Sequence, residues 1–195
     1  MQITYVDVIR PHEKAHALAY DIGLIVLGSL LIALSAKVSF YLPLSPVPVT
    51  GQTLAVLMAG ALMGRIRGAL CVAAYLGEGM AGLPVFAGPI AGPAYFLGPS
   101  GGYLVGFVAA AYIVGLLSEL GWDRRIFTSF AAFLLGNIAL YVPGLVWLAY
   151  FVGLDNVVMA GLVPFIPGDI LKILLAAIHL PIGWRILRHR HHSLR

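Results

Sequence analysis

The sequence predicts an all-α integral membrane protein, a bundle of six transmembrane helices, from its composition and from the placement of its basic residues. Of its 195 residues, 61% are hydrophobic and 10% are charged, and the mean hydropathy is +0.95. A soluble domain is about 45–50% apolar and about a quarter charged, so we expect lipid to contact most of this surface. The lysines and arginines fall into clusters between apolar segments, as they do on the cytoplasmic flanks of membrane helices.

Six apolar segments, separated by polar or Gly- and Pro-rich stretches, give the predicted helices. Each bilayer crossing needs about 20 mainly apolar residues, so this length leaves little room for a separate soluble domain. We expect one transmembrane domain over residues 1–195, with 1–21 as a cytoplasmic N-terminal segment and 188–195 as a basic cytoplasmic tail. The predicted helices cover residues 22–42, 53–64, 68–78, 102–120, 126–151 and 162–187.

The first predicted helix follows a segment that is too polar for lipid, and we expect it to stay in the membrane. The second and third are short, and Arg65 and Arg67 between them favour a turn at the membrane surface over one broken span. Gly60, Gly64 and Gly68 are spaced four apart there, which lets helices approach closely. The last three are long enough to cross the bilayer singly.

The basic residues predict the orientation, because cytoplasmic flanks and short loops carry the excess of Lys and Arg. The connections 43–52, 79–101 and 152–161 contain neither residue. An even helix count with both termini in the cytoplasm explains this pattern, so we expect a multi-pass protein of the cell (plasma) membrane. The net charge of +4 then reflects orientation and not nucleic-acid binding. The basic clusters are Arg10 and Lys14; Arg65 and Arg67; Arg124 and Arg125; and Arg185, Arg188, Arg190 and Arg195.

Two of the outer connections, 42–52 and 79–102, are rich in Pro and Gly but also apolar. Flexible linkers are more polar than this. Irregular backbone at membrane depth is tolerated only where it is buried in protein or lines a cavity. We therefore expect the outer loops to fold over a ligand pocket at the mouth of the bundle.

Asp169 and Lys172 form the strongest candidate for a polar site. Lys172 and Lys37 are the two basic residues outside the clusters, and Lys172 follows Asp169 by three residues, so both share one helix face. A charge at membrane depth costs about 2.5–3.5 kcal/mol on insertion scales. A structural ion pair with a helix cap would explain the pair, and a ligand site, which we favour, would explain it as well.

The other candidates are amides, a carboxylate and aromatic rings. Buried amides in lipid need partners, which contacts between helices would supply equally well. Glu78 stands at the end of the third predicted helix, where solvent would also suit it. Aromatic side chains could cover an apolar ring, although membrane proteins also place them at both interfaces. The full set of predicted ligand residues is Asp169, Lys172, Asn137, Tyr141, Gln52, Glu78, Phe86, Tyr95 and Tyr103.

An enzyme is not expected. Ser100 in Gly98-Pro99-Ser100-Gly101, taken with His179, is similar to the elements of an intramembrane serine protease. Ser100, however, belongs to the predicted outer mouth, and His179 follows Asp169 by ten residues, so at 1.5 Å per residue it lies roughly 15 Å deeper in the membrane than Asp169. A nucleophile and its base approach to about 3 Å. No G-x-x-x-x-G-K-[ST] motif occurs, and the His-rich tail 188–192 lacks the fixed geometry of a metal site. We expect no catalytic residue, cofactor or metal.

Five sequence blocks between about residues 30 and 187 add a family resemblance. They are 45–53 (SPVPVTGQT), 82–88 (GLPVFAG), 97–103 (LGPSGGY), Gly136-Asn137 with Tyr141 and Trp147, and Pro167-Gly168-Asp169 with Lys172. In order and separation they resemble the BioY family, the biotin-specific S components of energy-coupling-factor (ECF) transporters. Several ordered blocks are far more specific than a single motif.

The resemblance implies a six-helix S component that captures biotin from the outer side, with Asp169 and Lys172 as polar anchors. It also implies partners, namely membrane lipid and an ECF transmembrane coupling protein with ATPase subunits, or a homo-oligomer if the chain acts alone. Nucleic acid is not among them. Two alternatives stay open at this point: an S component for another small vitamin and, with much less support, the intramembrane protease.

Overall fold

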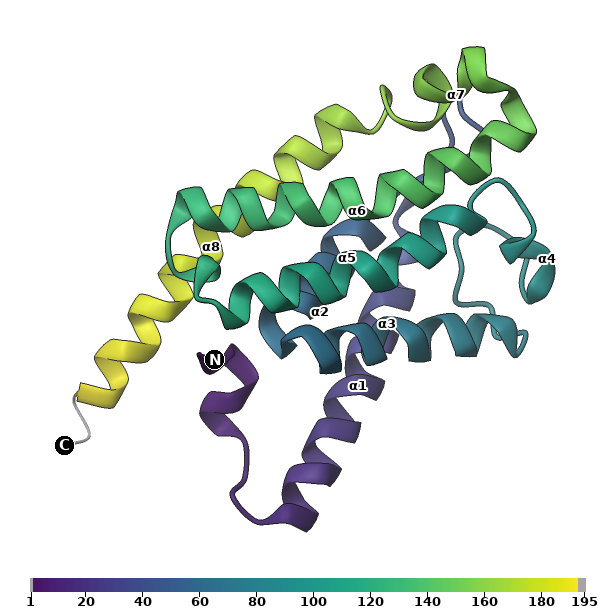
Figure 1. The fold of residues 1–195 in the computed structure, drawn as a ribbon. Coiled ribbons are helices and arrows are strands. Elements are labelled where there is room, and N and C mark those ends of the chain that lie inside the picture. The colour runs from purple at the N-terminus through teal and green to yellow at the C-terminus, as the bar shows by residue number, and fades with distance from the viewer. Residues whose placement is uncertain (1, 193–195) are drawn as a thin grey trace.

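Eight α-helices make up most of residues 2–192, the part of the chain that the computed structural model describes, with side chains through residue 187 (Figure 1). Of the predicted tail 188–195, the backbone of 188–192 continues the last helix, and residues 193–195 lie outside the described residues. Two 3-10 helices and one antiparallel strand pair complete this part. The order is η1 (Tyr5–Ile9), α1 (Lys14–Lys37), β1 (Ser39–Phe40), β2 (Val49–Thr50), α2 (Gln52–Met63), α3 (Arg65–Met80), α4 (Pro93–Phe96), α5 (Gly101–Glu119), η2 (Trp122–Arg124), α6 (Ile126–Val152), α7 (Leu154–Gly161) and α8 (Ile166–His192).

The first helix, α1, differs at both ends from the predicted range of 22–42. It starts at Lys14 because residues 14–19 are mostly good helix formers, and hydropathy marks where a helix enters lipid rather than where its backbone begins. It ends at Lys37, after which Ser39–Phe40 pairs with Val49–Thr50. This strand pair was not predicted, and it closes off the Pro-rich loop between its strands.

The turn between the short helices α2 and α3 is confirmed. Gly64 ends α2 with φ of +84°, a conformation that a residue with a Cβ rarely adopts. Gly60 then faces the backbone of α5, where a Cβ would come within 2.3 Å of the Ala111 carbonyl oxygen. The predicted close approach of helices at these glycines is therefore present.

Two helices, α4 and α7, were not predicted. They lie inside the connections 79–101 and 152–161, and they bring the count in the described residues to eight against the expected six. Four helices are long and apolar enough to cross a membrane: α1, α5, α6 and the part of α8 from Ile166 to Leu187. The structure is thus that of a predominantly helical, multi-pass membrane protein, as the composition predicts.

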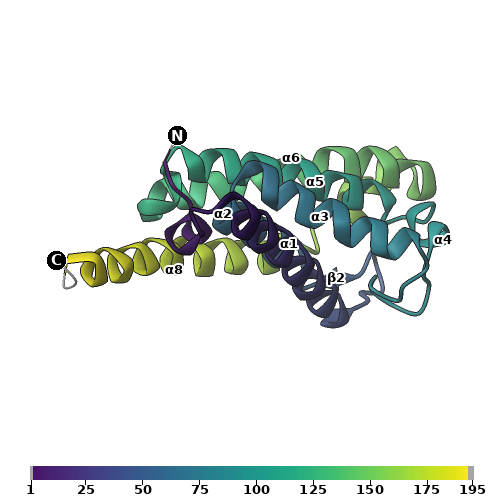
Figure 2. The same ribbon diagram turned by 90° about the horizontal axis from the view of Figure 1, so that it is seen from below.

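The helices form a flattened bundle with two distinct ends. α3, α5 and α6 lie side by side, and α1 and α8 run along the opposite face of the bundle (Figures 1 and 2). The N-terminal segment and the last turns of α8 lie at one end, and α4 and α7 lie at the other. We call these the N-terminal end and the loop end.

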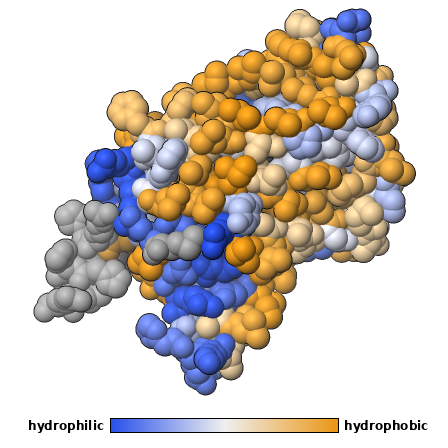
Figure 3. All heavy atoms as spheres, in the orientation of Figure 1, coloured by the Kyte–Doolittle hydropathy of each residue, from blue (hydrophilic) through white to orange (hydrophobic). Residues whose placement is uncertain are grey.

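Apolar side chains cover most of the surface seen in Figure 3, and hydrophilic residues gather at the N-terminal end. Large hydrophobic residues on α1, α6 and α8 are exposed, among them Leu34 at 65% and Val146 at 63%. The buried core lies where α2, α3, α5 and α6 meet, around Val56, Val72 and Val114. An exposed apolar surface on this scale fits contact with lipid.

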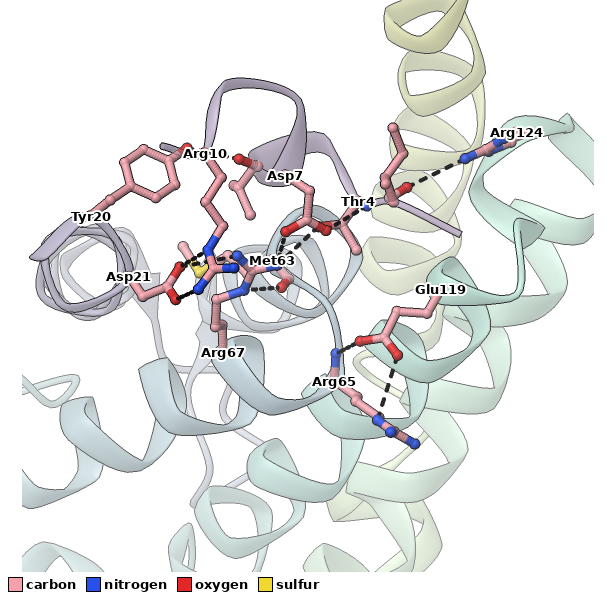
Figure 4. A network of polar contacts seen from close by, with 12 residues as sticks. Thr4, Asp7, Arg10, Tyr20, Asp21, Met63, Arg65, Arg67, Glu119 and Arg124 are labelled. Atoms are coloured by element: carbon pink, nitrogen blue, oxygen red, sulfur yellow. Dashed lines mark hydrogen bonds and ion pairs between the residues drawn. The ribbon is translucent and has the colours of Figure 1, made fainter. Parts of the chain in front are cut away.

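A network of ion pairs fastens the N-terminal segment to the bundle (Figure 4). Arg67 at the start of α3 donates to Asp7 at 2.5 Å and to Asp21 at 3.1 Å, and Arg10 pairs with Asp21 at 2.6 Å. Burial alone would raise the pKa of Asp7, but hydrogen bonds from Thr4 and Arg67 hold it below its ordinary value. Three segments that are distant in sequence are thus joined at the N-terminal end.

Candidate ligand-binding site

A small cavity lies toward the loop end, between β2, the start of α2, and helices α5, α6 and α8. Its volume is about 40 Å³, which is room for only a few water molecules. Its wall is mainly apolar and aromatic, with a few polar groups, the composition typical of small-molecule sites. The lining residues are Val47, Pro48, Thr50, Gln52, Thr53, Tyr95, Ser100, Tyr103, Leu104, Phe107, Leu140, Tyr141, Phe165, Asp169 and Lys172.

Asp169 is the acidic residue of the cavity and is 6% exposed. The first turn of α8 carries it, where free backbone N–H groups and the helix dipole favour an anion. The Tyr141 hydroxyl donates to its Oδ2 atom, and the Thr53 hydroxyl lies 3.5 Å from Oδ1. The carboxylate therefore accepts from α6 and α2 while belonging to α8.

Lys172 lies one turn further along α8 and directs its ammonium group into the same cluster. Its Nζ atom donates to the Thr50 carbonyl at 2.9 Å and to the Thr53 hydroxyl at 2.7 Å, and lies 3.4 Å from Asp169 Oδ1. An ammonium has three donors, and each has a partner here. Lys172 thus ties the end of the strand pair to α8, and a ligand that takes one of these donors must replace a protein acceptor.

Aromatic rings and one amide form the rest of the polar and flat wall. Tyr103 and Tyr141 meet edge to face at 6.0 Å, and the Tyr103 hydroxyl donates to Gly161 at the end of α7 at 2.8 Å. Gln52, 4% exposed, donates from its amide nitrogen to the Tyr75 hydroxyl. Tyr95 reaches the cavity from α4. Flat apolar surfaces therefore face a cluster of one carboxylate, one ammonium and several neutral groups.

The structure brings six of the nine predicted ligand residues to the cavity wall: Gln52, Tyr95, Tyr103, Tyr141, Asp169 and Lys172. Asn137 instead donates to Phe133 within α6, and its buried Oδ1 has no partner among the described residues. Glu78 lies between α3 and α1, where the Ser29 hydroxyl is 2.6 Å away. Phe86 lies behind the wall, stacked on Tyr95 at 4.8 Å.

The groups needed for serine-protease chemistry are not assembled around this cavity. Ser100 contributes to its wall, but His179 does not, and the His179 Nδ1 atom contacts the Leu175 carbonyl at 2.7 Å within α8. In the described residues no group of three or more His, Cys, Asp or Glu could hold a metal ion. The arrangement is suited to holding a polar ligand by hydrogen bonds and ion pairing.

Comparison with known proteins places the chain in a family. A model of the BioY family matches residues 10–189. The chain belongs to the BioY family. A BioY protein of Pyrococcus horikoshii, named "Probable biotin transporter BioY", is 38% identical over 161 residues, which cover 82% of this chain and 93% of the relative. The "Biotin transporter BioY" of Rhizobium etli is 36% identical over 166 residues, which cover 79% and 89%.

A solved BioY-like structure shares the fold. A crystal structure at 2.1 Å of the S-component for biotin from an ECF-type ABC transporter has a TM-score of 0.78 to this chain and 26% sequence identity. The match covers 90% of this chain and 95% of that one.

The lining residues that were not among the predicted ligand residues include Thr50 and Thr53, although both stand in the BioY-like block 45–53. Thr53 bridges Lys172 and Asp169, and the Thr50 carbonyl accepts from Lys172. The signal that could have found Thr53 was its position directly after Gln52, a predicted ligand residue, in the first turn of α2. A threonine in an apolar helix is common, so its type alone did not mark it.

Proposed function

We propose that this chain is a biotin-binding S component, which captures biotin at the outer face of the membrane for uptake. The observation that carries this proposal is the cluster of Asp169, Lys172 and Thr53 in an aromatic-walled cavity at the loop end. The relatives are named as biotin transporters and the similar crystal structure is that of an S-component for biotin, which supports the choice of ligand. Binding without covalent chemistry is the expected role, so no enzymatic activity is assigned.

The chemistry of biotin suits the groups around the cavity. The ureido ring offers two N–H donors and one carbonyl acceptor, and the carboxylate tail carries a negative charge. Asp169 can accept from ureido N–H groups, and Lys172 can pair with either the carboxylate or the ureido carbonyl. The rings of Tyr95, Tyr103 and Tyr141 can cover the apolar body of the ligand.

The cavity must enlarge to receive such a ligand. A volume of about 40 Å³ holds only a few waters, whereas biotin has sixteen heavy atoms by its chemical formula, on the order of ten times a water's bulk. We infer that six membrane helices, α1, α2, α3, α5, α6 and α8, form one transmembrane domain, and that the outer loops with α4 and α7 close over the pocket.

The proposed orientation puts both termini in the cytoplasm and the loop end outside. Its support is that Arg10, Arg65, Arg67 and Arg124 lie together at the N-terminal end (Figure 4), since cytoplasmic ends carry the excess of basic residues. For uptake we propose an ECF transmembrane coupling protein and ATPase subunits as partners. If the chain acts alone, a homo-oligomer takes their place.

Competition binding tests the ligand assignment. Purified protein should bind labelled biotin, and unlabelled biotin should displace it, whereas thiamine and riboflavin in the same excess should not. Mass spectrometry of small molecules retained through purification gives an independent check. Displacement by thiamine or riboflavin would favour an S component for a different vitamin.

A further inference from the structure

A loop behind the cavity wall is held in place by side chains of two other helices. Within residues 83–87, which we call the wall loop, three consecutive backbone carbonyls accept hydrogen bonds. Lys37 Nζ, at the end of α1, donates to Pro84 at 2.5 Å and to Phe86 at 3.0 Å. The Tyr75 hydroxyl, on α3, donates to Val85 at 3.3 Å.

The wall loop supports the ligand cavity through one aromatic contact. Its Phe86 ring is fully buried and stacks on Tyr95 with centroids 4.8 Å apart and planes 16° apart. Phe86 also meets Tyr75 edge to face, with ring centroids 5.5 Å apart. Gly79 leaves space for this ring, since a Cβ there would lie 2.0 Å from Phe86 Cζ. Tyr95 lines the cavity, so the position of the wall loop fixes part of the cavity wall.

A directional chain of hydrogen bonds links the same loop to Gln52. A carbonyl can only accept, so the single hydroxyl hydrogen of Tyr75 goes to Val85, and Tyr75 must accept from the Gln52 amide. The amide nitrogen of Gln52 is therefore directed at Tyr75. Its carbonyl oxygen, with no hydrogen bond to the described residues, is then the Gln52 atom that a donor in the cavity can reach.

The wall loop has no regular secondary structure, so no ladder of backbone hydrogen bonds fastens it. Helices α5, α6 and α8 lie on other sides of the cavity. The wall loop is fastened by the side-chain hydrogen bonds of Lys37 and Tyr75, by the buried Phe86 ring, and by one backbone hydrogen bond from the Leu83 N–H to the Glu78 carbonyl at 3.1 Å. Gly82 and Gly88, with φ of +93° and +81°, flank it, and these conformations permit sharp turns at its two ends. A transient opening of the cavity on this side therefore breaks these few contacts.

We propose that Lys37 and Tyr75 are positioning residues that hold the wall loop against Tyr95 and thereby set the rate at which ligand enters and leaves the cavity. Neither residue needs to touch the ligand. The proposal rests on the proposed function for its ligand and adds a role that the cavity-lining residues do not supply. In this proposal the hold is broken only while ligand passes and is made again afterwards, so it governs exchange rates more than affinity.

Exchange kinetics of labelled biotin test the proposal. Lys37→Met should raise the association and dissociation rates together by about tenfold, the effect of losing a hydrogen bond from a charged group, and should leave Kd within roughly threefold. Lys37→Arg keeps donors for both carbonyls and should restore slow exchange. Tyr75→Phe should cause a smaller rise, on the order of threefold. Lys14→Met and Tyr112→Phe are matched controls, because neither side chain forms a hydrogen bond within the described residues.

A measurement without ligand separates this proposal from the assignment of biotin. In a Cys71→Ala background, Ala87→Cys places a thiol at a fully buried position of the wall loop. A membrane-impermeant maleimide should label it about tenfold faster with Lys37→Met than with Lys37 or with Lys14→Met. Equal labelling rates would overturn the proposal, as would unchanged exchange rates accompanied only by a lower melting temperature. Failure of the parent protein to bind biotin would instead reject the proposed function, while the labelling result would still decide the role of Lys37.

Discussion

At the scale of single residues, Thr53 is the group through which the two charges of the cavity are connected. Its hydroxyl accepts from Lys172 at 2.7 Å and lies 3.5 Å from Asp169, whereas the direct distance between the charged groups is 3.4 Å. A hydroxyl both donates and accepts, so Thr53 can satisfy both partners at once. The side chains of Lys172 and Asp169 are only 19% and 9% exposed, which makes each such contact costly to lose.

Replacing Thr53 by Val, which has nearly the same shape, should weaken biotin binding by about 10- to 150-fold, the range for one hydrogen bond to a charged group. Equilibrium binding to the purified variant measures this change. Thr128→Val is the matched control, because the Thr128 hydroxyl bonds to the Trp122 carbonyl at the N-terminal end of the bundle. An affinity of Thr53→Val equal to that of the control would contradict the assigned role.

Sequence alone pointed to Asp169 and Lys172, which the structure places in the cavity wall, because charges are expensive at membrane depth and therefore stand out. It did not identify Thr53, since a hydroxyl costs little in an apolar helix. Glu78 was predicted as a ligand residue, but it is placed against Ser29 and away from the cavity wall. The position of a carboxylate along a helix does not reveal which neighbouring helix it faces.

At the scale of secondary-structure elements, α2 is held against α5 by contact between their backbones. Gly60 makes this possible, and Gly68 of α3 approaches the same point, where its Cβ would lie 2.7 Å from the Gly60 Cα. Hydropathy located the six longer helices, although α1 differs at both ends from its predicted range, but it did not indicate the strand pair, α4 or α7. The strand pair and α4 border or lie in connections rich in Pro and Gly, where no apolar periodicity indicates structure. α7 lies in the short connection 152–161, which the sequence predicts as a loop.

Gly60→Ala should destabilise the protein by about 1–3 kcal/mol, because its Cβ would overlap the Ala111 carbonyl oxygen and force α2 away from α5. Gly77→Ala on α3 is the matched control, since nothing lies within 4 Å of its Cβ and Ala is favoured over Gly in a helix. Thermal unfolding in detergent compares the two. Equal melting temperatures would show that the α2–α5 contact tolerates a wider spacing.

The N-terminal segment gives a pH-dependent prediction through Asp7. Hydrogen bonds hold the folded-state pKa of Asp7 below the unfolded value of about 3.9, so its stabilising effect is present above that value and is lost as the pH falls through the folded-state pKa. Wild type should therefore melt at a higher temperature than Asp7→Asn at neutral pH, and the difference should shrink below about pH 4.

Asp155→Asn, at an exposed position on α7, provides the control for that comparison and should melt like wild type throughout. A gap between wild type and Asp7→Asn that stays constant from neutral to acidic pH would mean that the charge of Asp7 does not stabilise the segment.

At the scale of the whole molecule, the positions of charge and of irregular backbone agree with a single orientation in the membrane. The basic residues that contact the N-terminal segment lie at one end (Figure 4), and α4, α7 and the strand pair lie toward the other (Figures 1 and 2). Between them the surface is largely apolar (Figure 3).

Labelling of single cysteines in intact cells tests this orientation. Leu44→Cys and Leu154→Cys, at positions that are 75% and 81% exposed near the loop end, should react with an impermeant maleimide from outside. Arg125→Cys should react only after the membrane is permeabilised. Cys71 is fully buried and leaves little background. Strong external labelling at position 125 would reverse the proposed topology.

The central claim is that Asp169 and Lys172 act together to bind biotin. Lys172→Ala tests this claim most directly when biotin affinity and the melting temperature without biotin are measured on the same preparation. Truncating one member of a buried, hydrogen-bonded charge pair costs about 2–5 kcal/mol. We therefore predict that biotin affinity falls by roughly 30- to several thousand-fold, while most of the variant protein stays folded at the temperature of the binding measurement. Unchanged affinity with a lowered melting temperature would mean that the pair is structural, and would contradict the account.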